Sequence, residues 1–196
     1  MYGPACAGKT HLLQAACREA SRQGRSSAYV PLSIFARQGA VILEGLNDVK
    51  LLALDDCDRV LDDRRWQQSL FGLINAVRNR RRCLLMAGRK NPATMRLALR
   101  DLQSRLVWGG VYAVHTLCDQ DKMKVLVRLA ADAGYRLNDD AAQYLFNTCP
   151  RDLSSQIASL KKLIDSGEPR KHTITAAISR RVLKKTQGQT GLDPQA

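Results

Sequence analysis

The feature that most constrains the fold is a complete phosphate-binding string, G-x-x-x-x-G-K-[ST], at the start of the chain. Its residues are Gly3, Pro4, Ala5, Cys6, Ala7, Gly8, Lys9 and Thr10. In such a P-loop the glycines let the backbone curl, so that successive N–H groups face the phosphates at the positive end of the following helix. The string opens an amphipathic segment, which is the context it requires. We therefore predict a nucleotide site in which Lys9 reaches the outer phosphates and Thr10 ligates Mg²⁺.

A second motif lies further along the chain, in the run Leu51 to Asp56 (LLALDD). A short, continuous apolar run of this kind is typical of a strand buried on both faces of a parallel sheet. We predict that Asp55 holds Mg²⁺, directly or through water, and that Asp56 orients or deprotonates the attacking water. The alternative is that the two acids only begin a loop.

The size and composition of the chain admit an α/β domain with a small helical one, or a single large domain. It has 196 residues, of which 45% are hydrophobic and 25% charged. No apolar run is long enough to span a membrane, and the start lacks the regions of a secretion signal. The six cysteines are scattered, with no CxxC pair. They are interpreted as reduced thiols of a cytoplasmic protein, not as disulfides or a zinc site.

Strand-like and helix-like segments alternate over the first part of the chain. Short strands are predicted at 27–32, 51–54, 83–87 and 111–115, with helices at 10–23, 34–46, 66–79 and 99–106. This alternation favours an α/β fold, a mostly parallel sheet sandwiched by helices. Only helical patterns follow, at about 119–133, 139–147, 150–164 and 175–185. We expect a nucleotide-binding α/β domain at 1–117, a small all-helical lid at 118–186 and a disordered tail at 187–196.

The formal net charge is +13, which suggests a polyanionic partner such as a nucleotide, a nucleic acid or an acidic protein face. The alternative is an arginine-rich solvated surface, and charge alone does not choose between them. Basic residues concentrate in two stretches, from Arg78 to Lys90 and from Lys161 to Lys185. Neither is interleaved with the aromatic residues of a single-strand platform, so direct DNA binding is left open.

Several segments of the chain resemble the bacterial DnaA-type AAA+ P-loop family. Gly8 to Leu13 (GKTHLL) is similar to the family's P-loop, and Leu102 to Gly109 (LQSRLVWG) to its arginine-finger segment. Arg151 to Leu153 (RDL) lies where the lid's sensor region is expected. The resemblance runs from Gly3 to about Leu183. Tyr29 to Leu32 (YVPL) and the short helical end are similar, within that family, to the Hda group of DnaA regulatory inactivators.

The resemblance implies an AAA+ fold that binds ATP, ADP or another nucleoside diphosphate together with Mg²⁺. It adds His11 and Arg151 to the nucleotide-binding residues. It also implies that Arg105 acts as a finger in trans, on the nucleotide of a neighbouring subunit. A planar, always charged guanidinium suits that role, because it neutralises charge developing on the γ-phosphate. A surface arginine is the alternative for Arg105, and Trp108 is interpreted as a packing anchor.

Three positions depart from the family pattern. Cys6 stands where these loops usually have a third glycine, and a positive φ there would cost a side chain about 1 kcal/mol. Arg89 replaces an acidic or small polar sensor. The lid's sensor arginine aligns with Ser154, so Arg151 would replace it only if its helix were rotated or shifted. Together these departures weaken the expectation of efficient ATP hydrolysis by this chain.

Only Met1 and Tyr2 precede the loop, whereas in a P-loop fold a central buried strand comes first. A parallel sheet without that strand would leave its neighbours unpaired. We therefore expect the natural product to be longer, or the chain to be a truncated gene model. In the Hda group the clamp-binding peptide lies in that N-terminal part, so sliding-clamp binding cannot be read from these residues.

The leading hypothesis is a regulator that contacts ATP-bound DnaA through Arg105, promotes hydrolysis of its ATP and represses initiation of DNA replication. The chain stops where the DNA-binding domain of DnaA would begin, which favours this reading. The DNA sliding clamp and a homo-oligomer are further expected partners. One alternative is a DnaA-like initiator or helicase-loader ATPase that acts on DNA. Another is a non-catalytic remnant, suggested by Cys6, Arg89 and Ser154.

Overall fold

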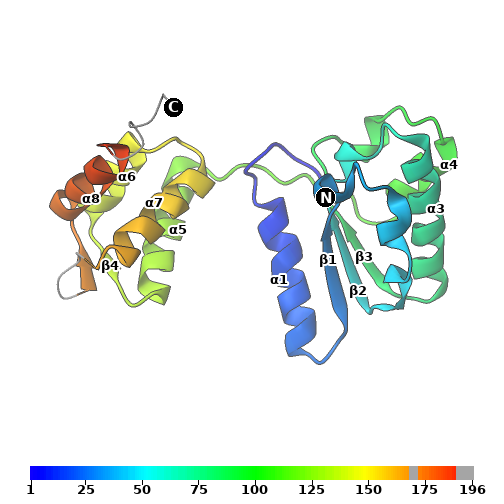
Figure 1. Cartoon of the computed structure of the whole chain (residues 1–196), viewed down its shortest axis with the longest axis horizontal. Helices are drawn as coiled ribbons and strands as arrows, with labels where there is room; N and C mark the ends of the chain where they lie inside the picture. The colour runs from blue at the N-terminus through cyan, green and yellow to red at the C-terminus, as the bar shows by residue number, and fades with distance from the viewer. Residues whose placement is uncertain (168–171, 189–196) are drawn as a thin grey trace, which may run out of the picture. The chain divides into compact units, whose positions relative to one another are not determined.

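The computed structural model describes residues 1–167 and 172–188. The chain forms two compact units that divide between Thr116 and Leu117 (Figure 1). Each unit has its own apolar core. Across the part of the chain that the structure describes, no helix is both long and apolar enough to cross a bilayer.

The first unit is built on a three-stranded parallel sheet in the order β1-β2-β3. The strands are β1 (Ser27–Pro31), β2 (Leu51–Asp55) and β3 (Cys83–Met86). In the register of the sheet, Leu54 of β2 lies opposite Val30 and Met86 of the neighbouring strands. The central strand β2 is the most deeply buried, as its continuous apolar run predicts.

Helices cover both faces of this sheet, which confirms the predicted α/β class. Helix α1 (Lys9–Arg22) lies on one face, and α3 (Arg64–Asn79) and α4 (Arg100–Leu106) lie on the other (Figure 1). Asp63 caps α3 by accepting a hydrogen bond from the backbone N–H of Arg65. The inner face of α3 is apolar and packs on the core of the unit; its buried apolar residues are Trp66, Leu70, Leu73, Ile74 and Val77.

Two sequence-based predictions in the first unit are wrong. The helix expected at 34–46 is broken into α2 (Leu32–Phe35) and the 3₁₀ turns η1 (Ala40–Leu43) and η2 (Leu46–Asp48). Gly39 and Gly45 precede the two turns with φ of 94° and 76°, values that end a right-handed helix. The remaining 3₁₀ turns are η3 (Cys57–Arg59) and η4 (Pro92–Thr94).

The strand expected at 111–115 is present only as a single bridge between Ala113 and Tyr2. Tyr2 donates to the carbonyl of Tyr112 at 2.9 Å and accepts from the N–H of Val114 at 2.7 Å. On its other side Tyr2 bridges to Gly88, just after β3. Residues 1–3 are therefore held between the end of β3 and the segment 112–114, and this fixes where the P-loop begins.

The described part of the second unit contains four helices, α5 (Asp119–Asp132), α6 (Asp139–Thr148), α7 (Leu153–Asp165) and α8 (Ala176–Gly188). It also contains a parallel ladder of two short strands, β4 (Arg136–Leu137) and β5 (Thr173–Ile174). The prediction of an all-helical lid is wrong in this detail, because strands of two residues are too short to show a period.

The boundaries of this unit also differ slightly from those predicted. Helix α7 begins at Leu153, because Asp152 caps it by accepting from the backbone N–H of Ser155 at 2.8 Å. Helix α8 reaches Gly188, so the first two residues of the predicted tail are helical. The rest of that tail lies outside the described residues. So do Glu168 and Pro169, which with Gly167 are expected to form the loop between the last two helices.

Candidate functional site

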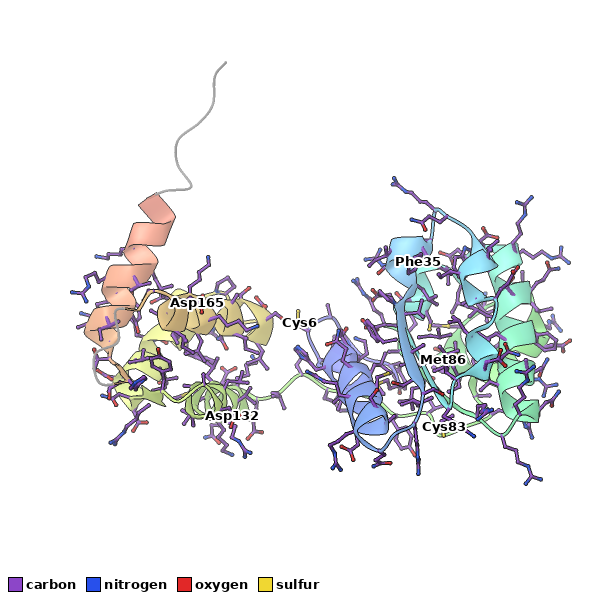
Figure 2. The ribbon with its side chains drawn as sticks, turned by 60° about the horizontal axis from the view of Figure 1, so that its bottom comes forward. Cys6, Phe35, Cys83, Met86, Asp132 and Asp165 are labelled. Atoms are coloured by element: carbon purple, nitrogen blue, oxygen red, sulfur yellow. The ribbon has the colours of Figure 1, made fainter. Side chains whose placement is uncertain are left out.

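The P-loop forms a turn between Tyr2 and the first residue of α1. Gly8, the N-cap of α1, has φ of 92° and Cys6 has φ of 60°, both left-handed. Cys6 lies on the loop that precedes α1 (Figure 2) and is exposed together with Pro4 and Ala5. This conformation is unfavourable by roughly 1–2 kcal/mol for a residue other than glycine. Cys6, which stands in place of the family's third glycine, therefore carries this penalty.

The N-terminus of α1 is suited to an anion. Among the described residues, no side chain caps this end and no acid lies in its first turn. The first N–H groups of a helix lack partners within the helix and carry a partial positive charge. His11 and Thr10 are exposed on this first turn, and Ala7 is half-buried before it. The predicted phosphate-binding residues therefore surround one positive helix end.

Lys9 is buried at this end of α1, with a relative exposure of 9%. Its Nζ donates to the carbonyl oxygens of Gly3 at 2.9 Å and Pro4 at 2.6 Å. A buried ammonium needs such partners, because an unpaired buried charge is strongly unfavourable. An ammonium has three N–H donors, and these two bonds use two of them. Lys9 thus closes the loop on itself and also carries the main positive charge of the site.

Gly3 is required by packing rather than by a positive φ. A Cβ built on Gly3 would lie 2.0 Å from the carbonyl oxygen of Val114, a contact that no side chain can make. The close approach results from the hydrogen bond between Val114 and Tyr2. The first glycine of the string therefore lets the loop pass against the segment 112–114.

The two predicted Mg²⁺ ligands are in direct contact. The hydroxyl of Thr10 donates to Oδ2 of Asp55 at 2.6 Å, joining α1 to the end of β2. Asp55 is only 2% exposed, and its other oxygen accepts from the backbone N–H of Asp56 at 2.9 Å. These hydroxyl and carboxylate oxygens are the hard ligands that Mg²⁺ prefers. Within the described residues, no larger cluster of His, Cys, Asp and Glu gathers that could hold a metal.

Tyr29 is a third member of this group that sequence reasoning missed. Its hydroxyl donates to the same Oδ2 of Asp55 at 3.0 Å. Burial, and then the nearby Asp55 carboxylate, raise the pKa of Tyr29 to about 12, so the phenol stays a donor. The signal was present in the register: Tyr29 lies opposite Ala53, two residues before Asp55, and residues two apart share a face of the sheet.

Asp56 is held in a left-handed conformation, with φ of 53°. Its Oδ2 accepts a hydrogen bond from the hydroxyl of Ser33 at 2.7 Å. Ser33 belongs to α2, immediately after β1, and was not singled out in the sequence. Short polar side chains tolerate this backbone region better than most residues. The hydroxyl of Ser33 therefore orients the carboxylate of Asp56. This side chain is not free at the start of a loop.

Arg89, at the expected sensor position, is exposed after β3. Its backbone N–H donates to Oδ1 of Asp58 at 3.0 Å. A Cβ built on Gly88 would lie 3.2 Å from the same oxygen. The turn is therefore stabilised by Asp58, while the position itself carries a cation.

Arg105 lies near the end of α4 and stacks on an aromatic ring. Its Cζ lies 3.7 Å from the ring centroid of Trp108, and the Cζ of Arg78 lies 3.2 Å from the same centroid. Two guanidinium groups this close to one centroid must occupy opposite faces of the indole. Trp108 is 50% exposed, and the side chains that pack on its ring are these two arginines. Helix α4 packs with α3, on the sheet face opposite α1 (Figure 1).

Arg151 belongs to the second unit and is exposed before α7. Its carbonyl accepts a hydrogen bond from Nζ of Lys122 at 2.9 Å, and the same ammonium contacts Asp119 at 3.1 Å. Lys122 therefore ties the first turn of α5 to the turn before α7. Ser154 is exposed in the first turn of α7, one turn beyond Arg151. The backbone at Arg151 is fixed by this contact, whereas its side chain is solvated.

Comparison with known families gives two matches that follow one another along the chain. Residues 1–113 match the family model described as the bacterial DnaA ATPase domain. Residues 119–183 match the model described as the lid domain of Hda. A relative from Haemophilus influenzae, named only as an uncharacterized protein, is 32% identical over 184 residues, covering 93% of this chain and 80% of the relative.

Solved structures of DnaA share the fold. AMPPCP-bound DnaA from Aquifex aeolicus is similar with a TM-score of 0.69 and 23% identity, over 96% of this chain. The chain spans only 59% of that DnaA. Domain III of DnaA from Thermotoga maritima is similar with a TM-score of 0.75 and 17% identity, over 94% of this chain and 82% of the other. At these identities the likeness establishes the architecture of the ATPase unit and lid.

Proposed function

Because the chain belongs to the bacterial DnaA ATPase-domain family, we propose that it is a nucleotide-bound AAA+ regulator of DnaA in the cytoplasm. It promotes hydrolysis of the ATP bound to DnaA and so represses initiation of DNA replication. The observation that carries this proposal is the order of the two matches, a DnaA-type ATPase unit followed by a lid of the Hda type. The lid match supports a regulator over an initiator.

The nucleotide site of this proposal is the P-loop with its two acids. The loop from Gly3 to Thr10 and the N-terminus of α1 would hold the phosphates of ATP or ADP. Lys9 would turn its third N–H donor to them, and Thr10 and Asp55 would hold Mg²⁺. When bound, Mg²⁺ supplies positive charge that offsets the charge of the phosphates. His11 and Arg151 are further candidates for contact with the nucleotide.

Slow turnover by the chain itself is part of the proposal. Asp56 accepts a hydrogen bond from Ser33, which orients its carboxylate as a water-positioning group requires. However, Arg89 places a cation at the expected sensor position, and Ser154 stands where a lid arginine aligns. The chain would therefore retain its nucleotide, and the catalytic group that it lends to a partner would be Arg105.

The position of Arg105 supports action in trans. Its helix packs with α3 on the side of the sheet opposite α1, which carries the P-loop lysine. The helix of the finger and the phosphate-binding helix of the same chain therefore lie on opposite faces of the sheet. A guanidinium inserted at a neighbour's γ-phosphate stabilises the charge of the transition state, and such fingers contribute about 10³ to 10⁵ in kcat.

The test is stimulation of ATP hydrolysis by DnaA, with the sliding clamp on DNA present as the further proposed partner. Arg105→Ala should reduce the stimulated rate by about a thousandfold or more. Arg64→Ala is the matched control, because Arg64 is an exposed arginine at the far end of α3. Undiminished stimulation by Arg105→Ala would contradict the proposal. Sedimentation with and without nucleotide would test self-association.

A second candidate is an initiator or helicase loader that hydrolyses ATP and binds DNA. The observation that favours it is the net charge of +13 together with the exposed Arg78, Arg80 and Arg81 at one end of α3. This candidate requires intrinsic turnover with Mg²⁺ and DNA affinity that falls steeply with salt. Absence of both would exclude it.

A further inference from the structure

The stack of Arg78, Trp108 and Arg105 brings two positive charges onto one exposed ring. The guanidinium carbons lie 3.2 Å and 3.7 Å from the indole centroid. An indole is the best aromatic partner for a cation, and a guanidinium also stacks on it as a flat plate. The two guanidinium groups repel each other at this separation, whereas two arginines in solvent would stay apart. The attraction of each cation to the indole ring offsets this repulsion.

The backbone fixes the ring relative to Arg105. The N–H of Trp108 donates to the carbonyl of Arg105 at 3.2 Å, at the end of α4. After Trp108 the chain turns through Gly110, where a Cβ would lie 2.5 Å from the ring of Tyr112. A side chain at Gly110 would therefore require the exposed ring of Tyr112 to move, and Trp108 is held just beyond the end of the helix that carries Arg105.

The guanidinium of Arg105 is oriented as well as stacked. Its Nε is buried, with no hydrogen-bond partner in the described part of the chain. The Nε side thus faces the protein, and the ring centroid of Phe71 in α3 lies 5.7 Å from Cζ of Arg105. The two terminal nitrogens are the remaining hydrogen-bonding groups of the fork, and these are the groups that bind a phosphate bidentately.

We infer that Trp108 is a positioning residue for the Arg105 finger, and that Arg78 holds the opposite face of the indole. This inference rests on the proposed function and deepens it. The indole keeps the guanidinium flat and its terminal nitrogens directed outward before the partner's nucleotide arrives. A finger that is already oriented loses less conformational entropy when it inserts, so the stack raises the maximal rate rather than the affinity of docking.

The experiment compares Trp108→Leu, Trp108→Phe and Arg78→Gln with the wild type and with the Arg64→Ala control. The maximal rate of stimulated ATP hydrolysis and the half-saturating concentration of the regulator are measured separately. Trp108→Leu should lower the maximal rate about threefold to thirtyfold, the range of a partly exposed cation–π contact. The half-saturating concentration should change less than twofold. Trp108→Phe should restore part of the rate, and Arg78→Gln should lower it less than Trp108→Leu.

The stack itself is measured independently by tryptophan fluorescence. Trp66 is only 2% exposed, so quenching by acrylamide reports mainly on Trp108. Arg78→Gln and Arg105→Ala should each increase that quenching, because each uncovers one face of the indole. Unchanged quenching in both variants would overturn the stack, and full stimulation by Trp108→Leu would overturn the positioning role. A raised half-saturating concentration with an unchanged maximal rate would also overturn it, since that result describes a docking contact.

Failure of the proposed function gives a different pattern. In that case Arg105→Ala retains full stimulation, whatever the fluorescence shows. The positioning role of Trp108 is then excluded as well, because it depends on the finger. Loss of stimulation by Arg105→Ala combined with full activity of Trp108→Leu contradicts the positioning role alone. Trp108 is half exposed, so its variants are expected to fold, and thermal unfolding of each variant checks this.

Discussion

The hydroxyl of Thr10 donates a 2.6 Å hydrogen bond to Asp55, across 45 residues of sequence. This bond joins the first turn of α1 to the carboxyl end of β2, the two places where the sequence predicts Mg²⁺ ligands. Tyr29 donates to the same carboxylate oxygen. A buried carboxylate thus accepts hydrogen bonds from two side chains on one oxygen, and these bonds fix its orientation at the place where a cation is expected.

Nucleotide binding should stabilise the chain through Lys9. At a concentration about a hundredfold above its Kd, a ligand that binds only the folded state adds about 2.7 kcal/mol to the free energy of unfolding. Thermal unfolding with Mg²⁺ and ADP or ATP should therefore show a rise in Tm that Lys9→Ala abolishes. Lys50→Ala, which removes an exposed lysine, should keep the rise. Equal shifts in wild type and Lys9→Ala would contradict the site.

Gly3→Ala should destabilise the first unit, because its methyl group would meet the carbonyl of Val114 at 2.0 Å. Overpacking of this kind costs about 1–3 kcal/mol. Gly72→Ala is the matched control, since the methyl group would enter open space in the middle of α3. That control should stabilise the helix by about 0.8–1 kcal/mol. Denaturant unfolding measures both, and equal signs for the two variants would refute the packing argument.

Cys6→Gly should stabilise the P-loop, because a glycine adopts the observed φ of 60° without the penalty that a side chain incurs. The expected gain in the free energy of unfolding is about 1 kcal/mol, reduced by the greater entropy of glycine in the unfolded chain. The measurement is denaturant unfolding, with nucleotide binding followed in parallel. A loss of stability would show that the thiol makes a contact worth more than the strain.

Stability should fall at high pH through Tyr29. Its pKa is raised from an ordinary value near 10 to about 12 in the folded chain, mainly by burial. A raised pKa means that the folded state favours the neutral phenol. The stabilisation is therefore complete below about pH 10 and is lost as the pH rises toward 12.

Comparison with Tyr29→Phe isolates this effect. Burial also raises the pKa of Cys57 to about 12, so the wild type alone would mix two titrations. The difference in unfolding free energy between wild type and Tyr29→Phe should be constant up to about pH 10 and then shift against the wild type. A difference that stays constant through pH 12 would show that Tyr29 titrates normally.

The motifs were predictable because each combines a local signal with a required context. The string from Gly3 to Thr10 opens a helix, and the run from Leu51 to Leu54 is apolar at every position, as a central parallel strand requires. The glycines at 39 and 45 explain one of the two errors in the first unit, the helix expected at 34–46. Apolar spacing there looked helical, but two positive φ values divide it into short turns.

The partners of the site residues were not predictable, because they come from distant parts of the chain. Ser33 reaches Asp56 and Tyr29 reaches Asp55 only because β1 and β2 are neighbours in a particular register. The stack of Arg78 on Trp108 depends on how α3 and α4 pack. Such contacts follow from tertiary geometry, and a single sequence carries no periodic signal for them.

The bonds from Lys9 to the carbonyls of Gly3 and Pro4 have a consequence for selectivity. An incoming ligand meets an ammonium whose charge is already partly neutralised by two dipoles, so binding is a competition between oxygens. A neutral hydroxyl or amide offers no advantage over the carbonyls that it would compete with. A phosphate chain competes better than the carbonyl groups for the ammonium, because a full negative charge attracts a cation more strongly than a dipole at the same distance. The two carbonyl bonds of Lys9 therefore favour ligands that carry full negative charge over uncharged ligands.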